Sequence, residues 1–350
     1  MKDKRENNDR DVDEIFEGFK EDKLKKAVRK AKFYSIVRNV IISIIVVCLM
    51  SVAVIYFGQA MAYEYETPIQ IAVSEFYYIS APNTYIGEVR RYHSLFGGRD
   101  EYATYKILKD KIVYTGEKSY VYGPFKSDYG DLIGTESPII FGTSYDTDDL
   151  KYNKYNVLGQ REMVFYYPYI KYQDYKNDLS LLDKIGPDKY MEMALSFDRA
   201  YSIDEVRKMI PEDVTVAWYW VDDQSDEEKE ESKPRKIKQE GTGEIVDVPA
   251  SVRSERTAYG IKAYDETGKE IPDPVSRFVG ALENGKEYDT RYKWEFTRVF
   301  NNIAGKDGKI TESDIRVQGV VVTGDSNSLK SLYNLSFIKA SSLGVVTDRY

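Results

Sequence analysis

The chain contains one long apolar run near its N-terminus. Residues 40–57, VIISIIVVCLMSVAVIYF, include eighteen side chains and no charge. As an α-helix this run would be about 27 Å long, close to the hydrocarbon thickness of a bilayer. The small and apolar residues at 58–62 lengthen it, so we expect a single membrane-spanning helix over residues 39–62. The remainder of the chain must then act on either side of a membrane.

The charges that flank the run indicate its orientation. Seven cations with no acid among them precede it: Lys23, Lys25, Lys26, Arg29, Lys30, Lys32 and Arg38. After the run, the next cation is Arg90. Because basic residues favour the cytoplasmic side of a membrane, we expect residues 1–38 in the cytoplasm and residues beyond about 63 outside the cell. The same seven cations are expected to contact anionic lipid headgroups.

Two other interpretations of the apolar run are weaker. A core helix of a soluble protein is rarely apolar on every face over eighteen residues. A secretory signal peptide is a closer alternative, because residues 60–62 form an A-x-A pattern. However, the run is longer than the usual 7 to 15 residues of such a signal, and its leader is too long. A cell-membrane anchor is therefore favoured.

Composition supports a protein divided by a membrane. Residues 1–38 carry 12 basic and nine acidic residues, so a formal net charge of −8 leaves −11 on the other 312 residues. An acidic exterior argues against binding nucleic acid or another polyanion. The only cysteine, Cys48, lies inside the apolar run, so no disulfide stabilises the outer part. Apolar burial must stabilise it, and nearly 290 residues suffice for one or two cores.

The cytoplasmic segment has the pattern of one amphipathic helix. From residue 13 onward, apolar side chains recur at intervals of three to five residues; the candidate partner-binding residues are Ile15, Phe16, Phe19, Leu24 and Val28. Thirty-eight residues are too few for an enzyme but enough for a helix that docks into a groove of a protein partner. A basic helix lying on anionic lipid is the alternative.

Alternating segments predict strands in the outer part. In its first half we expect strands at 69–73, 76–79, 105–108, 111–114 and 120–122, with a turn at 81–83. In its second half we expect strands at 191–197, 214–221, 258–264, 315–323 and 344–347. Ser202 with Glu205 is expected to form a capping box at the start of a short helix. We expect a second helix over residues 288–303 and a third, short helix capped by Asp325 or Ser326. Residues 222–243 are charged and are expected to form an exposed insertion.

These elements predict an α+β ectodomain, with a mixed or antiparallel sheet and short helices, behind the membrane helix. We expect a membrane-proximal module over 63–160 and a C-terminal module over 161–350. Their boundary would fall between residues 135 and 185, in or near a tyrosine-rich stretch with no clear periodicity.

The sequence lacks the motifs of common enzymes. His93 is the only histidine, no Cys or His pair lies outside the membrane, and no phosphate-binding glycine loop or Gly-x-Ser-x-Gly motif occurs. The segment from Asp307 to Asp314 lacks the acidic spacing of a calcium loop and is expected to form a turn. The acids at 146, 148 and 149 are expected to form a solvated loop. We therefore expect no catalytic, cofactor-binding or metal-binding residues.

Several tracts resemble bacterial sigma-factor regulators. Near the membrane, these are residues 23–31 and 81–86 (APNTYI). In the second half they are 194–198 (ALSFD), 201–206 (YSIDEV), 214–222 (VTVAWYWVD), 319–324 (GVVVTG) and 337–344 (FIKASSLG), with Leu329 and Leu332. The resemblance extends over about 20–120 and 170–350 and is most specific in the second half. Proteins of this kind are membrane-anchored anti-sigma factors, mainly of Gram-positive bacteria.

The resemblance implies a function and partners. The cytoplasmic segment would hold an extracytoplasmic-function sigma factor inactive, and the ectodomain would sense the state of the envelope. A second membrane regulator protein is a further possible partner. The zinc-binding His…Cys…Cys signature of many anti-sigma domains is missing here. The alternative function is a membrane-anchored extracellular module that binds an envelope ligand or protein; an enzyme acting on surface substrates is a third interpretation.

Overall fold

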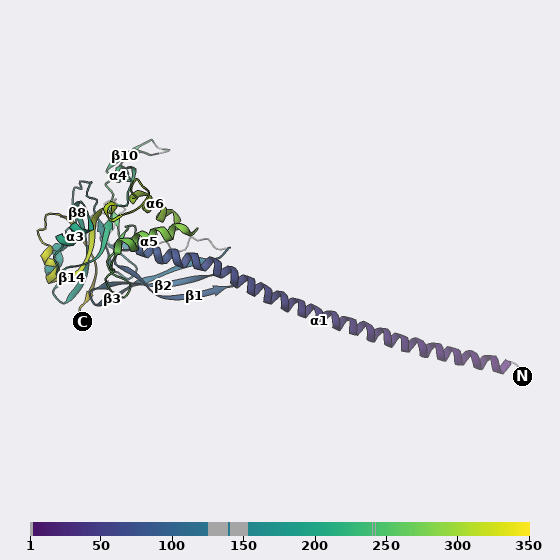
Figure 1. Ribbon diagram of the computed structural model, residues 1–350. Helices are drawn as coiled ribbons and strands as arrows, with labels where there is room; N and C mark the ends of the chain where they lie inside the picture. Colours follow the sequence, from purple (N-terminus) through teal and green to yellow (C-terminus); the bar gives the residue numbers. More distant parts are fainter. Residues whose placement is uncertain (1–2, 125–138, 141–152, 240, 242) are drawn as a thin grey trace. The chain divides into compact units, whose positions relative to one another are not determined.

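A long N-terminal helix and a mixed α+β unit make up the described structure. This computed structural model describes residues 3–124, 139–140, 153–239, 241 and 243–350, with the backbone alone for 3–20 and 139–140. It divides into two compact units, Met1–Ala60 and Met61–Tyr350. Helix α1, Asp3–Ile79, extends through the first unit and into the second (Figure 1). The second unit includes residues from both ectodomain modules expected from the sequence.

The two strands expected at 69–73 and 76–79 are wrong, because these residues form the last turns of α1. The buried positions there are Ile69, Ala72, Val73, Phe76 and Ile79. Their spacing of three to four residues places them on one face of a helix, whereas a strand would bury alternate residues. The high content of aromatic and β-branched residues suggested strands, but the helical burial pattern prevails. Pro68 lies inside this helix and does not end it.

A three-stranded antiparallel sheet follows α1. Its strands, in spatial order, are β1 (Thr84–Ser94), β2 (Gly97–Leu108) and β3 (Lys111–Tyr122). The expected turn at 81–83 is confirmed, and Ala81 and Asn83 there have φ angles of 50° and 49°. Burial alternates along β2, so one face of this sheet covers the core and the other is more exposed. The strands expected at 105–108, 111–114 and 120–122 all lie within β2 and β3.

The centre of the second unit is a five-stranded antiparallel sheet, which confirms the expected α+β fold. In spatial order its strands are β13 (Gly260–Lys262), β9 (Thr215–Val221), β14 (Val317–Asp325), β8 (Lys189–Tyr201) and β15 (Ile338–Asp348). Along β9, Tyr219 and Val221 face one hydrophobic cluster, whereas Trp218 and Trp220 face another. A sheet buried on both faces explains why its central strands are apolar almost throughout.

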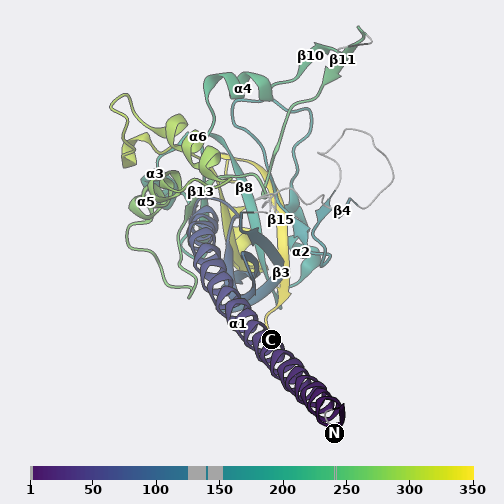
Figure 2. The ribbon, with the colours of Figure 1, turned by 90° about the vertical axis from the view of Figure 1, so that its right-hand side faces the viewer.

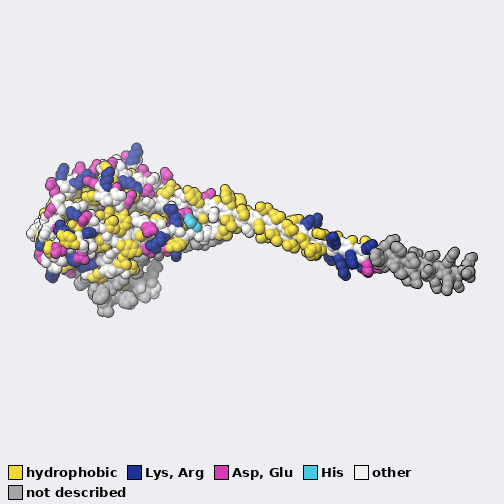
Figure 3. Space-filling view, turned by 90° about the horizontal axis from the view of Figure 1, so that it is seen from below, with side chains coloured by type: hydrophobic (Ala, Val, Ile, Leu, Met, Phe, Trp, Pro, Cys, Tyr) yellow, Lys and Arg dark blue, Asp and Glu magenta, His cyan; other side chains and the backbone are white. Residues whose placement is uncertain are grey.

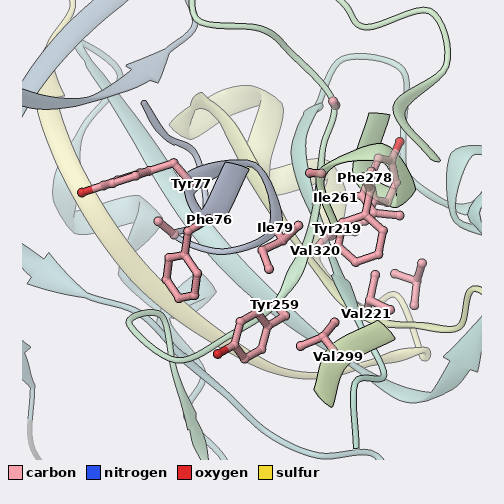
Figure 4. Close-up of a cluster of buried hydrophobic side chains, with 14 of the residues drawn as sticks. Phe76, Tyr77, Ile79, Tyr219, Val221, Tyr259, Ile261, Phe278, Val299 and Val320 are labelled. Carbon is pink, nitrogen blue, oxygen red and sulfur yellow. The ribbon is translucent and has the colours of Figure 1, made fainter. Parts of the chain in front are cut away.

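Helices cover one face of the five-stranded sheet. They include α3 (Ile203–Met209), α5 (Pro274–Glu287), α6 (Lys293–Ile303), α7 (Ser326–Leu329) and the end of α1. Figure 4 shows Phe76 and Ile79 of α1 near Tyr259, Ile261, Val299 and Val320 in this core. The capping box of Ser202 and Glu205 and the Asp325 cap are present as expected.

A tyrosine-rich segment covers the opposite face of the sheet. Met163, Phe165, Tyr166, Tyr167 and Tyr172 pack against Trp218 and Trp220, and the ring centroids of Phe165 and Trp220 lie 5.1 Å apart. The segment includes β7 (Val164–Phe165), which pairs with β12 (Arg253–Ser254). The residues of this layer show no regular hydrophobic period because short strands and loops, rather than one regular element, form it.

The insertion expected to be exposed at 222–243 is exposed only in part. Asp223, Gln224 and Ser232 are buried, which corrects the expectation for its first half. Helix α4 (Asp226–Ser232) begins there with its own capping box. Beyond it, the hairpin of β10 (Arg235–Lys238) and β11 (Ile245–Val248) projects from the rest of the second unit (Figure 2).

The remaining elements are short. They are β4 (Ile139–Ile140), β5 (Lys154–Tyr155), β6 (Arg161–Glu162), α2 (Leu182–Ile185) and three 3-10 turns at Asp178–Leu181, Glu312–Asp314 and Lys330–Leu332. The turn expected between Asp307 and Asp314 is present, since backbone hydrogen bonds join Gly305 to Lys309 and to Gly308.

Candidate functional site

The first unit presents an apolar helix with no protein covering it. In the described part of the chain, one helix is long and apolar enough to span a membrane, and none of its apolar window is buried. Successive residues such as Ile41, Ile42, Ile44 and Ile45 are each about half exposed. Exposed apolar side chains on every face of a helix suit lipid, and a secretory signal near the N-terminus meets the same criteria of length and composition. Figure 3 shows the resulting yellow band along the helix.

The predicted basic flank lies directly before this band. Lys25, Arg29 and Arg38, like the other four cations, are exposed on α1 (dark blue in Figure 3). At about 100° of rotation per residue, the seven positions are distributed around much of the helix axis rather than along one stripe. Lys25 forms a 2.8 Å ion pair with Glu21, and such an exposed pair contributes little to stability. A ring of cations beside an apolar band suits a layer of lipid headgroups around the helix.

Helix α1 also separates the predicted partner-binding residues into two sets. Leu24 and Val28 are 64% and 58% exposed and lie one turn apart on one face. Positions 15, 16 and 19 belong to the same helix, but their side chains are outside the described residues. Position 19 precedes Leu24 by five residues, which is about 140° around the axis, whereas position 16 precedes it by eight residues, which is about 80°. A partner groove that binds one face of a helix could therefore contact position 16 together with Leu24, but not position 19 together with Leu24.

Buried ion pairs within the second unit were not evident from the sequence. Lys106 of β2 lies 2.5 Å from Glu192 of β8 and 3.2 Å from Glu255, and all three are largely buried. Asn83 donates a 3.2 Å hydrogen bond to the second carboxylate oxygen of Glu192. These contacts join the turn after α1 and the three-stranded sheet to the central sheet.

The buried cluster continues to a second ion pair. Arg256 forms a two-nitrogen contact with Glu162, whose charge acts on Glu255. Burial, together with the charges of Glu192 and Glu162, raises the pKa of Glu255 to about 7 against the lowering effect of Lys106. For Lys106, burial lowers the pKa, but the two carboxylates outweigh it and raise the pKa above its ordinary value. The cluster is a structural contact in which the pKa of one carboxyl group is raised towards neutral pH.

A second buried network holds the start of the insertion. Asp223 is 1% exposed and accepts hydrogen bonds from Arg298 of α6 at 2.6 Å and Arg253 of β12 at 3.3 Å. Asn302 donates to the backbone carbonyl of Asp223 at 2.9 Å, and Arg298 also contacts Glu228 at 3.1 Å. The network thus fastens α4 and α6 to each other and accounts for the buried beginning of the insertion.

None of these arrangements resembles a catalytic or metal centre. The described residues contain no group of three or more His, Cys, Asp or Glu side chains that could hold a metal ion. His93 lies on β1, where its Nδ1 is 3.1 Å from the hydroxyl of Tyr122. The acids at 146, 148 and 149 fall outside the described residues.

The described residues therefore form one long apolar helix and a mixed α+β unit. Comparison with protein families matches two models, sigma factor regulator N-terminal at residues 25–113 and sigma factor regulator C-terminal at residues 182–345. The chain belongs to this sigma factor regulator family, which is regulatory rather than catalytic and implies a sigma factor partner. Searches of curated proteins and of solved structures give no match.

The extent of the N-terminal match bears on the predicted contact residues. It begins at residue 25, so Val28 and six of the seven flanking cations lie inside it, whereas Ile15, Phe16, Phe19 and Leu24 precede it. The match continues through the end of α1 and into β3. Membership of the family consequently rests on the basic flank, the apolar helix and the ectodomain, and the partner-binding residues remain a prediction.

Proposed function

We propose that this chain is a single-pass membrane anti-sigma factor. Its N-terminal residues would bind an extracytoplasmic-function sigma factor in the cytoplasm, and its second unit would sense the envelope from outside. The observation that carries the proposal is the apolar, uncovered helix with a basic flank inside a sigma factor regulator match. Holding a sigma factor at the membrane requires only that the bound helix cover a surface that RNA polymerase needs.

Docking through one helix face is the simplest form of this contact. An amphipathic helix binds a groove through residues three or four apart, as positions 15, 16 and 19 are. We place the main contact on this set rather than on Leu24 and Val28, because the latter lie within the basic flank, next to Lys23 and Arg29. Leu24 and Val28 would then face lipid headgroups or a second membrane regulator.

Two double variants test which face binds. Phe16→Asp with Phe19→Asp should raise expression from the cognate sigma-dependent promoter, because a charge on each aromatic position opposes burial in a groove. Leu24→Asp with Val28→Asp is the matched control within the basic flank and should change expression less. Membrane-fraction immunoblots check that all variants accumulate equally. Equal, unchanged reporter output from both double variants at normal protein levels contradicts helix-face docking.

A deletion separates regulation from surface binding. Removing residues 2–20 keeps the basic flank and the apolar helix, so insertion should persist. An anti-sigma factor would lose repression of its promoter, whereas an anchored extracellular binding module would not. Retained repression would favour the binding module.

The proposed orientation has a separate test. Cys48 is the only cysteine, so replacing it with alanine gives a background for single cysteines at chosen sites. In this background, the cysteine of Asn8→Cys should be labelled by an impermeant maleimide only after the membrane is broken. The cysteine of Ser313→Cys, at an exposed position, should be labelled by the same reagent in intact protoplasts. The opposite labelling pattern contradicts an N-terminus in the cytoplasm.

A further inference from the structure

A pocket in the second unit combines a buried lysine with several tyrosine rings. The pocket has a volume of about 290 Å³ and lies where the last turns of α1 meet β1, β2 and β13. Its walls include Tyr77, Tyr78, Tyr85, Tyr102, Arg91 and Lys262. This volume is near the lower end of the range for small-molecule sites and excludes a folded partner.

Lys262 is the unusual residue of this pocket. It is 4% exposed, and its ammonium donates a hydrogen bond to the backbone carbonyl of Thr84. In the described part of the chain, no carboxylate lies within 4.0 Å of this ammonium, although it has three N–H donors. A buried ammonium without an anion is costly, and burial lowers the pKa of Lys262 to about 7. Side chains with strongly shifted pKa values are concentrated at binding and catalytic sites.

Three tyrosine rings lie close to the ammonium of Lys262. Its ammonium lies 4.5 Å from the ring centroid of Tyr85, 5.7 Å from that of Tyr78 and 5.9 Å from that of Tyr77. A cage of tyrosines normally suits a cationic ligand, but here the cation belongs to the protein. Glu266 on the wall of the same pocket acts on this ammonium from beyond 4.0 Å, so a direct anionic contact is the one that the described residues do not supply.

The walls of the pocket are held in place before any ligand binds. The hydroxyl of Tyr85 donates to the carbonyl of Tyr264 at 3.1 Å, and that of Tyr78 donates to Glu266 at 3.1 Å. Arg277 stacks 3.6 Å from the ring centroid of Tyr78 and pairs with Glu75 at 2.7 Å. Fixed rings reduce the entropy lost when a ligand stacks against them.

Arg91 adds a second cation at the rim. Its side chain is 52% exposed, and its Nε lies 3.5 Å from Glu66, which leaves part of the guanidinium toward the pocket and solvent. The anion must be small, because the acidic exterior repels extended polyanions and the volume admits about one ring with a substituent. A singly charged carboxylate suits this pocket better than a phosphate, because the carboxylate of Glu266 on the pocket wall repels a doubly charged anion more strongly.

We propose that this pocket binds a small organic carboxylate, with its carboxylate on Lys262 and its ring or apolar body against Tyr78 and Tyr85. The ligand would also contact Gln70 and Ser74 of α1, the helix that carries the apolar run. The inference goes beyond the proposed anti-sigma function and does not depend on it, because binding is measured on the purified chain without a sigma factor.

Binding of 4-fluorobenzoate to the full-length chain in detergent micelles tests the proposal. Fluorine NMR should show saturable binding at one site with a Kd on the order of 1 mM, as expected for a ligand of about ten heavy atoms. Lys262→Met keeps the length and apolar stem of the side chain but removes its charge, and binding should weaken at least tenfold. Arg91→Gln should weaken it two- to fivefold. Lys330→Met, on a surface lysine paired with Asp183, is the matched control and should bind as the wild type does.

Probe chemistry distinguishes a carboxylate site from a generic cavity or anion site. 4-Fluorobenzamide has the same ring without a negative charge and should bind at least tenfold more weakly, and inorganic phosphate should not displace the benzoate. Affinity should also fall between pH 6 and pH 8.5, since Lys262 loses its proton; the charged groups facing it are Glu266 and Arg277, with the tyrosines of α1 and β1 around it.

Three results would overturn the proposal. They are equal binding of the amide, displacement by phosphate at equal concentration, and full benzoate affinity in both Lys262→Met and Arg91→Gln. If Lys262→Met does not fold, Arg91→Gln and the amide decide the question, because neither perturbs the core. Failure of every carboxylate to bind would reject this site while leaving the sigma-dependent reporter results unaffected.

Discussion

Gly285 of α5 is a residue at which one added methyl group should destabilise the second unit. A Cβ built there would lie 2.4 Å from ring atoms of Phe296 in α6, and Phe296 is fully buried. The ring cannot move aside without disturbing Phe76 and Tyr292, which pack around it. We expect Gly285→Ala to lower the free energy of unfolding by about 1–3 kcal/mol, as overpacking does, despite a better helix propensity.

Gly280 on the same helix is the matched control for that substitution. No atom lies within 4 Å of a Cβ built at Gly280, so Gly280→Ala should stabilise by about 0.5–1 kcal/mol through helix propensity alone. Urea unfolding of the full chain in micelles, followed by fluorescence of the buried Trp218 and Trp220, measures both variants. Equal stabilisation by the two alanines would show that α5 and α6 are not in this contact.

The side chains whose roles could be predicted from the sequence are those that form hydrogen bonds with nearby backbone. The Ser202 and Glu205 capping box and the Asp325 cap depend on partners within three residues, and both were confirmed. Lys106 and Lys262 depend on partners 86 and 178 residues away. No local pattern marks such a lysine as buried, so these side chains could not be assigned before the fold was known.

At the scale of elements, Asp223 joins the segment after β9 to α6 and β12. Replacing it with asparagine removes the anion between Arg253 and Arg298, whose side chains are 17% and 14% exposed. Breaking a buried pair in this way leaves Arg253 without its anion and Arg298 with Glu228 alone, and we expect a loss of about 3–5 kcal/mol. Asp226→Asn, an exposed position in the first turn of α4, should cost less than about 0.5 kcal/mol.

The same urea titration of the full chain distinguishes those two variants. A small, equal shift of the unfolding midpoint in both would mean that Asp223 does not hold the helices together. A large shift for Asp223→Asn alone would establish the network as the fastening of α4 to α6.

Strands and helices could be predicted from the sequence where their apolar residues form a simple pattern. Strands β8, β9 and β14 were predicted because both of their faces are apolar, and α6 because Phe296, Val299 and Phe300 share one helix face. The end of α1 was assigned to strands because its residue types favour strands, although its spacing is helical. Helix α5 was missed, yet Asp273 followed by Pro274 is a helix-start pattern that could have revealed it.

At the scale of the whole molecule, two buried groups give stability an unusual dependence on pH. The pKa of Glu255 is raised to about 7 in the folded chain, so between about pH 4.5 and 7 the folded state keeps a proton that the unfolded state has lost. The free energy of unfolding contributed by Glu255 therefore falls as the pH rises through this window. The pKa of Lys262 is lowered to about 7, so between pH 7 and 10.5 the unfolded state holds the extra proton, and stability rises with pH.

Together these opposite slopes predict a minimum of stability near pH 7 within the window from pH 5.5 to 9. Each limb should amount to about 3–5 kcal/mol across its full range, since one pKa unit corresponds to about 1.4 kcal/mol. Glu255→Gln should flatten the acid limb and leave the alkaline limb, whereas Lys262→Met should do the reverse.

Urea unfolding of the full chain at pH 5.5, 7 and 8.5 tests this minimum of stability, with Lys330→Met as the control that keeps both limbs. A maximum at pH 7 in the wild type, with parallel curves for both variants, would contradict it. The two groups lie on different contacts, Glu255 between the sheets and Lys262 beside the end of α1, so loss of one limb without the other locates each proton.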